Sequence, residues 1–162
     1  MFKLIANLVS ALGLSTALLC AAPASAQTIV DPQSGLIKVR SAYSMEETIQ
    51  RIRKDIADKG IMFFSAVDQA QLAAGAGIKL NPSTLLSFGN PPLGAQFLTS
   101  NPFSGLDWPV RVLVLQDDSG AVWAAYTDFA WIAMRHGIRD REQQFATASG
   151  VVQSITSTIR AK

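Results

Sequence analysis

The sequence predicts an α+β domain, in which a mainly antiparallel sheet of about five strands carries helices on one face. Three observations support this class: a tight hairpin turn, two longer amphipathic helices, and short apolar runs between them. The turn is Asp117-Asp118-Ser119-Gly120, between strands expected at 110–115 and 121–127. Strands joined by so short a turn pair antiparallel, and this pairing favours an antiparallel sheet.

The first half of the domain is expected to alternate strands and helices. Loose alternation predicts a strand over 36–43, and segment 44–47 has the pattern of a capping box, with Ser44 and Glu47 as its partners. The following helix is expected to end at Lys59-Gly60, since a basic last turn and a glycine favour a helix stop. Further strands are expected at 61–67 and 84–88, and short helices at 69–76 and 93–99.

The second half adds the hairpin and two more helices. Asp128 is expected to cap a helix over 129–135, which ends at His136-Gly137. The last helix is expected over about 141–159 because apolar residues there recur at helical spacing. Its inward residues are Phe145, Val152, Ile155 and Ile159. Residues 27–34 show no such pattern and are expected to be a flexible lead-in, so the domain would cover 35–162.

Residues 1–26 have the composition of a cleavable signal peptide. An uncharged, Leu- and Ala-rich run follows Lys3, and Ala24-Ser25-Ala26 fits the small-x-small cleavage pattern. Two alternatives stay open. The run is about long enough to be a retained membrane anchor, and Cys20 is placed for a lipoprotein, although Leu19 precedes it where a small residue is needed. We expect a periplasmic or secreted protein with no membrane contact after cleavage.

The composition excludes several classes of function. The only cysteine, Cys20, would leave with the signal, so the mature chain would have no disulfide and no thiolate chemistry. The 14 Lys and Arg nearly balance the 12 Asp and Glu, which argues against nucleic acid as a partner. A single histidine argues against the usual zinc sites, and nucleotide-binding glycine motifs and the GxSxG elbow do not occur. We expect no metal and no cofactor.

Five residues near the ends of separate elements are candidates for a ligand site. They are Phe88, Asn90, Arg111, Arg135 and His136. His136 is the side chain whose ordinary pKa allows proton transfer near neutral pH. Arg135 could hold an anion, and Asn90 offers both a donor and an acceptor. Structural roles stay open beside these: Asn90 as a turn residue and His136 as a helix cap.

Segments spread over 36–160 resemble the bacterial family called domain of unknown function number 302. They include FGNP at 88–91, Asn101-Pro102, GLDWPVRVLV at 105–114 and RHGI at 135–138. Trp108 and Arg111 depart from it, since the family tends to have an aliphatic residue and a lysine there. The resemblance implies a curved antiparallel sheet, similar in layout to half of a TATA-binding protein, and a dimer. It implies no established activity.

Three functions are therefore expected as alternatives. The first is a non-enzymatic module that binds a small ligand, for which an anion is the candidate, near the five residues above. The second is an enzyme with His136 as general acid or base and Asn90 or Arg111 stabilising an anion. The third is a structural homodimer formed through the helix face of Phe129, Trp131 and Ile132.

Overall fold

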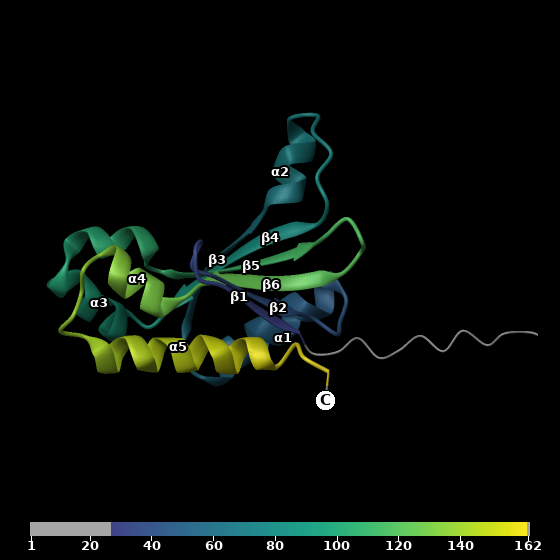
Figure 1. Cartoon of the computed structure of the whole chain (residues 1–162). Helices are drawn as coiled ribbons and strands as arrows, with labels where there is room; N and C mark the ends of the chain where they lie inside the picture. Colours follow the sequence, from purple (N-terminus) through teal and green to yellow (C-terminus); the bar gives the residue numbers. More distant parts are fainter. Residues whose placement is uncertain (1–26, 162) are drawn as a thin grey trace, which may run out of the picture.

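The structure, a computed structural model, describes residues 27–161, which form a six-stranded sheet with helices around it. The strands are β1 (Thr28–Asp31), β2 (Leu36–Arg40), β3 (Met62–Asp68), β4 (Ser83–Gly89), β5 (Val110–Gln116) and β6 (Val122–Thr127). They lie in the order β1-β2-β6-β5-β4-β3, with antiparallel neighbours throughout (Figure 1). The helices are α1 (Met45–Asp58), α2 (Gln69–Gly75), α3 (Pro91–Ser100), α4 (Phe129–Arg135), α5 (Glu142–Ser157) and the 3₁₀ helix η1 (Pro102–Asp107). The predicted α+β class with a mainly antiparallel sheet is confirmed.

One face of the sheet forms the core. Alternate residues of the central strands are fully buried there, among them Val39, Val114 and Ala124. Helices α1 and α5 lie along this face, as Figure 1 shows, and contact each other. The predicted inward residues of the last helix, Phe145, Val152, Ile155 and Ile159, are all buried. The helical spacing in the sequence therefore identified the buried side of α5 correctly.

Short-range signals start the helices where they were expected. Ser44 accepts a hydrogen bond from the Glu47 amide at 3.3 Å and caps α1. The Glu47 carboxylate instead lies 2.8 Å from Arg51, so only one half of the predicted capping box forms. Asp68 and Asp128 cap α2 and α4 as predicted. Caps depend on neighbours within one turn, which explains why sequence alone located them.

The predicted hairpin joins β5 to β6. The Asp117 carboxylate accepts hydrogen bonds from the Ser119 hydroxyl at 2.6 Å and from the Trp123 indole N–H at 2.8 Å. These two donors, first Ser119 and then Trp123, lower the pKa of Asp117 to about 2. Gly120 has a φ of +83°, which glycine adopts without strain.

The flexible lead-in predicted for 27–34 is wrong, because this segment contains β1. Thr28 to Asp31 pair antiparallel with Val39 to Leu36, which makes β1 an outer strand of the sheet. Asp31 closes the turn by accepting the Gln33 amide at 3.0 Å. So short a run becomes a strand only when β2 supplies its hydrogen-bond partners. The sheet therefore has six strands rather than about five.

Residues 1–26 lie outside the described part of the chain, and the signal peptide with its periplasmic or secreted location stays a prediction. Within residues 27–161, no helix combines the length and the apolar character that crossing a bilayer requires.

The β3 end of the sheet carries a projection, which we call the arm: β3, α2 and the loop that leads to β4. Figure 1 shows α2 standing away from the other helices. Six large apolar side chains of the arm are exposed: Met62, Phe64, Val67, Leu72, Ile78 and Leu80. Single exposed apolar residues are normal on a protein surface, but six on one projection favour an interaction there.

Candidate functional site

A cavity of about 360 Å³ lies where one end of the sheet meets α3, η1, α4 and α5. This volume falls within the range of roughly 300–1,000 Å³ that is common for small-molecule sites. Its apolar wall includes the core residues Phe88, Phe97, Phe129, Ile132, Phe145 and Val152. The wall is therefore built from residues that the fold already holds in place.

Two glycines make room for an aromatic wall of this cavity. A methyl group added at Gly94 would lie 2.0 Å from Trp108 Nε1, and one at Gly89 would lie 3.3 Å from the same indole. The Trp108 ring therefore rests directly on the backbone at the start of α3. Phe64 meets this ring edge to face, with centroids 5.9 Å apart. Trp108 thus forms part of the cavity wall.

The cavity has few polar groups. Ser104, only 2% exposed, lies in its wall, and Ser104 Oγ has no hydrogen-bond partner among the described residues. Lys59, Asn90 and Thr147 also line the cavity and are exposed, so they mark where it opens to solvent. Asp107 is the other charged lining residue, and it joins the cavity to a neighbouring polar cluster.

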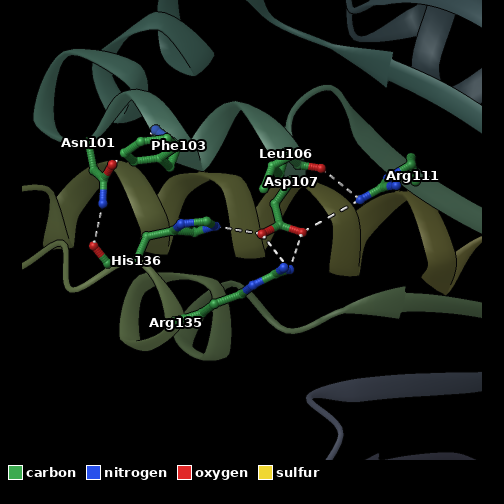
Figure 2. A network of polar contacts seen from close by, with 7 residues as sticks. All are labelled: Asn101, Phe103, Leu106, Asp107, Arg111, Arg135 and His136. Carbon is green, nitrogen blue, oxygen red and sulfur yellow. Dashed lines mark hydrogen bonds and ion pairs between the residues drawn. The ribbon is translucent and has the colours of Figure 1, made fainter.

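Figure 2 shows this cluster, in which Asp107 is the common partner of three cationic or basic side chains. Asp107 Oδ2 lies 2.6 Å from His136 Nε2 and 3.0 Å from Arg135 Nη1. Arg111 Nη2 lies 3.5 Å from Asp107 Oδ1 and also donates to the Leu106 carbonyl at 3.0 Å. The Asp107 and His136 side chains are each 6% exposed, whereas Arg111 and Arg135 keep 49% and 43% exposure.

Asn101 ties the two helices of the cluster together. Its side-chain oxygen accepts the Phe103 amide at 3.0 Å and so caps η1. Its side-chain nitrogen donates to the His136 carbonyl at 2.8 Å, at the end of α4 (Figure 2). One amide thus fixes η1, which carries Asp107, relative to α4, which ends at His136.

The structure brings three of the five predicted site residues together and separates the other two from them. Arg111, Arg135 and His136 converge on Asp107, while Phe88 and Asn90 line the cavity. Asp107 belongs to both groups, yet it was not among the predicted site residues. Asp107 was hard to recognise as a site residue in the sequence. It is a lone carboxylate, four positions before Arg111, inside a segment noted only for its family resemblance.

Some of the five predicted site residues have structural roles. Asn90 caps α3 by accepting the Leu93 amide at 3.1 Å, and Phe88 is a core residue at 1% exposure. His136 is the C-cap residue of α4, but its ring is held by Asp107.

The helix face predicted to form a dimer is internal, because Phe129 and Ile132 are 6% and 8% exposed. That prediction is wrong.

Within residues 27–161, no three His, Cys, Asp or Glu side chains are grouped so that they could hold a metal ion.

The fold and the cavity define a small α+β domain with a mainly apolar cavity that opens to solvent. The chain belongs to the family "Domain of unknown function DUF302", which it matches over residues 37–160. The crystal structure of an uncharacterized conserved protein DUF302 from Bacillus stearothermophilus superimposes with a TM-score of 0.71. At 17% identity, the match covers 78% of this chain and 98% of the other, and it shows the shared fold.

Two curated relatives carry the name of an ion channel. The protein named fluoride-specific ion channel FluC 1 of Brucella suis biovar 1 (strain 1330) is 40% identical over 111 residues. The protein of the same name from Brucella abortus biovar 1 (strain 9-941) has the same identity over the same length. These matches cover 68% of this chain but only 43% and 40% of the two relatives. The chain thus spans less than half the length of either.

Proposed function

We propose that this domain binds a small, largely apolar molecule in the cavity beside Trp108, without catalysing a reaction. The supporting observation is Ser104, a residue that lines the cavity at 2% exposure and whose hydroxyl has no hydrogen-bond partner among residues 27–161. A buried hydroxyl without a partner costs roughly 1–3 kcal/mol. A ligand oxygen or nitrogen beside Ser104 would remove that cost.

The size of the cavity agrees with a small-molecule ligand. At roughly 30 Å³ for each water-sized group, about 360 Å³ accommodates on the order of a dozen non-hydrogen atoms. The exposed residues Lys59, Asn90 and Thr147 leave a way in from solvent. The ligand would therefore contact mainly the core side chains that line the cavity.

The same geometry favours binding over catalysis. If His136 were the general acid or base, one of its ring nitrogens would have to lie within hydrogen-bond reach of the substrate. The His136 side chain is 6% exposed, its Nε2 faces Asp107 at 2.6 Å, and His136 is not among the residues that line the cavity. Ser104 Oγ has no hydrogen-bond partner in the described chain, so the Ser104, His136 and Asp107 side chains do not form a catalytic triad there.

Ala148→Leu tests the cavity directly. Ala148 is 6% exposed and lines the cavity, so three added carbons would occupy space that the ligand needs. We expect binding of the uncharged fluorophore 1-aminoanthracene to weaken more than tenfold, while stability stays within about 1 kcal/mol of the wild type. Fluorescence titration and urea denaturation measure the two quantities.

Ala95→Leu is the matched control, since Ala95 is exposed on α3. It should bind the fluorophore as the wild type does. Equal binding by all three proteins would place the fluorophore elsewhere and contradict the proposed site.

We propose, as a second function, that the arm forms a homodimer. The outer side of β3 has no neighbouring strand in the described sheet, and two copies could pair there antiparallel around a two-fold axis. The six exposed apolar side chains of the arm present on the order of 500 Å² per copy, or about 1,000 Å² for two, which reaches the lower limit for a specific interface.

Ile78→Glu tests this interface. Ile78 is 61% exposed in the arm, so a carboxylate there leaves the monomer stable but would be desolvated in the dimer. We expect the wild type to be a dimer and the variant a monomer at micromolar concentration by light scattering. Met134→Glu is the control, because Met134 is 70% exposed on α4, outside the arm. A monomeric wild type, or a dimer broken only by Met134→Glu, contradicts the arm as the interface.

A further inference from the structure

We infer that the molecule bound in the cavity is uncharged and apolar, with one hydroxyl or carbonyl oxygen that meets Ser104. This inference rests on the proposed binding function and narrows the ligand to one chemical class. An uncharged ligand replaces the anion that the sequence favoured. Three features of the cavity support this inference: its charged side chains, the start of helix α3 and its hydrogen-bonding groups.

Both charged side chains that line the cavity already have partners. Lys59 is the C-cap residue of α1, and its Nζ lies 2.6 Å from Oδ2 of Asp55, which is one turn earlier in the helix. Asp107 faces His136, Arg135 and Arg111, as described above. A carboxylate or ammonium ligand would lose its hydration against an apolar wall that offers it no unpaired opposite charge, which is strongly unfavourable.

The helix that starts at the cavity offers no anion site either. A helix N-terminus binds anions through the free amides of its first turn. In α3 the first two positions are Pro91 and Pro92, which have no amide hydrogen. The next amide, of Leu93, is already bonded to the Asn90 side chain at 3.1 Å. An anion therefore finds no donor from this helix end.

Ser104 remains as the buried group that can recognise a polar atom. Its hydroxyl can both donate and accept, so it suits an alcohol or a carbonyl oxygen equally well. A hydrogen bond between neutral groups contributes up to about 1.4 kcal/mol, which corresponds to tenfold in affinity. The remainder of the ligand would be held by the apolar wall, in proportion to the area it buries.

Three ten-carbon compounds separate the classes: decan-1-ol, decanoate and decylammonium have the same number of carbons and differ in the charge of the head group. Each is titrated against the wild-type protein carrying 1-aminoanthracene at pH 7.5, and displacement of the fluorophore is measured. We expect decan-1-ol to displace it at a concentration at least tenfold below that of either ion. In Ser104→Ala, decan-1-ol should bind about tenfold more weakly than in the wild type.

Ser154→Ala is the matched control, since Ser154 is an exposed serine of α5 outside the cavity wall. It should bind decan-1-ol like the wild type. If the fluorophore binds but either ion competes as well as the alcohol, the uncharged class is wrong while the binding function stands. An affinity for decan-1-ol that Ser104→Ala leaves unchanged overturns the role of Ser104. If neither the fluorophore nor any of the ten-carbon compounds binds the wild type, the binding function itself is wrong.

Discussion

Asp107→Ala is expected to destabilise the protein more than any other substitution considered for this chain, by about 2–3 kcal/mol. Removing the carboxylate leaves His136, which is 6% exposed, without its partner and brings the half-exposed Arg111 and Arg135 together as like charges. Breaking a fully buried ion pair costs about 3–5 kcal/mol. The value expected here is lower because solvent screens the two arginines. Urea denaturation followed by circular dichroism measures the loss.

Asp118→Ala is the control for this prediction. Asp118 is an exposed carboxylate of the β5–β6 turn, with one partner, the Asn81 side chain at 2.8 Å. Its removal should change stability by no more than about 0.5 kcal/mol. If Asp107→Ala were equally mild, the cluster would not hold η1 and α4 together, and the position of Asp107 at the cavity would need another cause.

Gly35→Ala is expected to have the second-largest effect, a loss of about 2 kcal/mol. Gly35 has a φ of +67°, and a methyl group there would lie 2.3 Å from Trp131 Cγ. The backbone strain accounts for about 1 kcal/mol, and the displaced indole for the remainder. Trp131 packs against the core, so its fluorescence should also shift as its ring moves.

Gly77→Ala separates the two contributions to this loss. Gly77 has a similar φ of +73°, but nothing lies within 4 Å of an added methyl group. This variant should lose only the backbone contribution, about 1 kcal/mol. Equal losses in the two variants would show that Trp131 does not rest on Gly35 in solution.

Much of the fold could be predicted because its signals are local. The caps at Ser44, Asp68 and Asp128 and the turn at 117–120 depend on groups a few residues apart. The buried side of α5 follows from helical spacing. β1 was missed because a four-residue strand is stable only beside its partner, and its sequence has no periodic pattern long enough to detect.

The candidate site was predicted only in part, for a related reason. Arg111, Arg135 and His136 were recognised by residue type, but each could equally have capped an element or faced solvent. Only the packing of η1 against α4 shows that they share Asp107, since Asp107 and His136 are 29 residues apart. Ser104 gave no signal at all, because a serine becomes conspicuous only when it is buried without a partner.

By itself the sequence determined the class of the fold, most of its elements and the family to which the chain belongs, because these depend on periodicity, caps and short motifs. The tertiary structure alone decided that the helix face of Phe129 and Ile132 is internal and that the arm is exposed. It also decided that a cavity forms beside Trp108. The reason is physical: burial and cavity volume are properties of packed surfaces, and those surfaces come from segments distant in the chain.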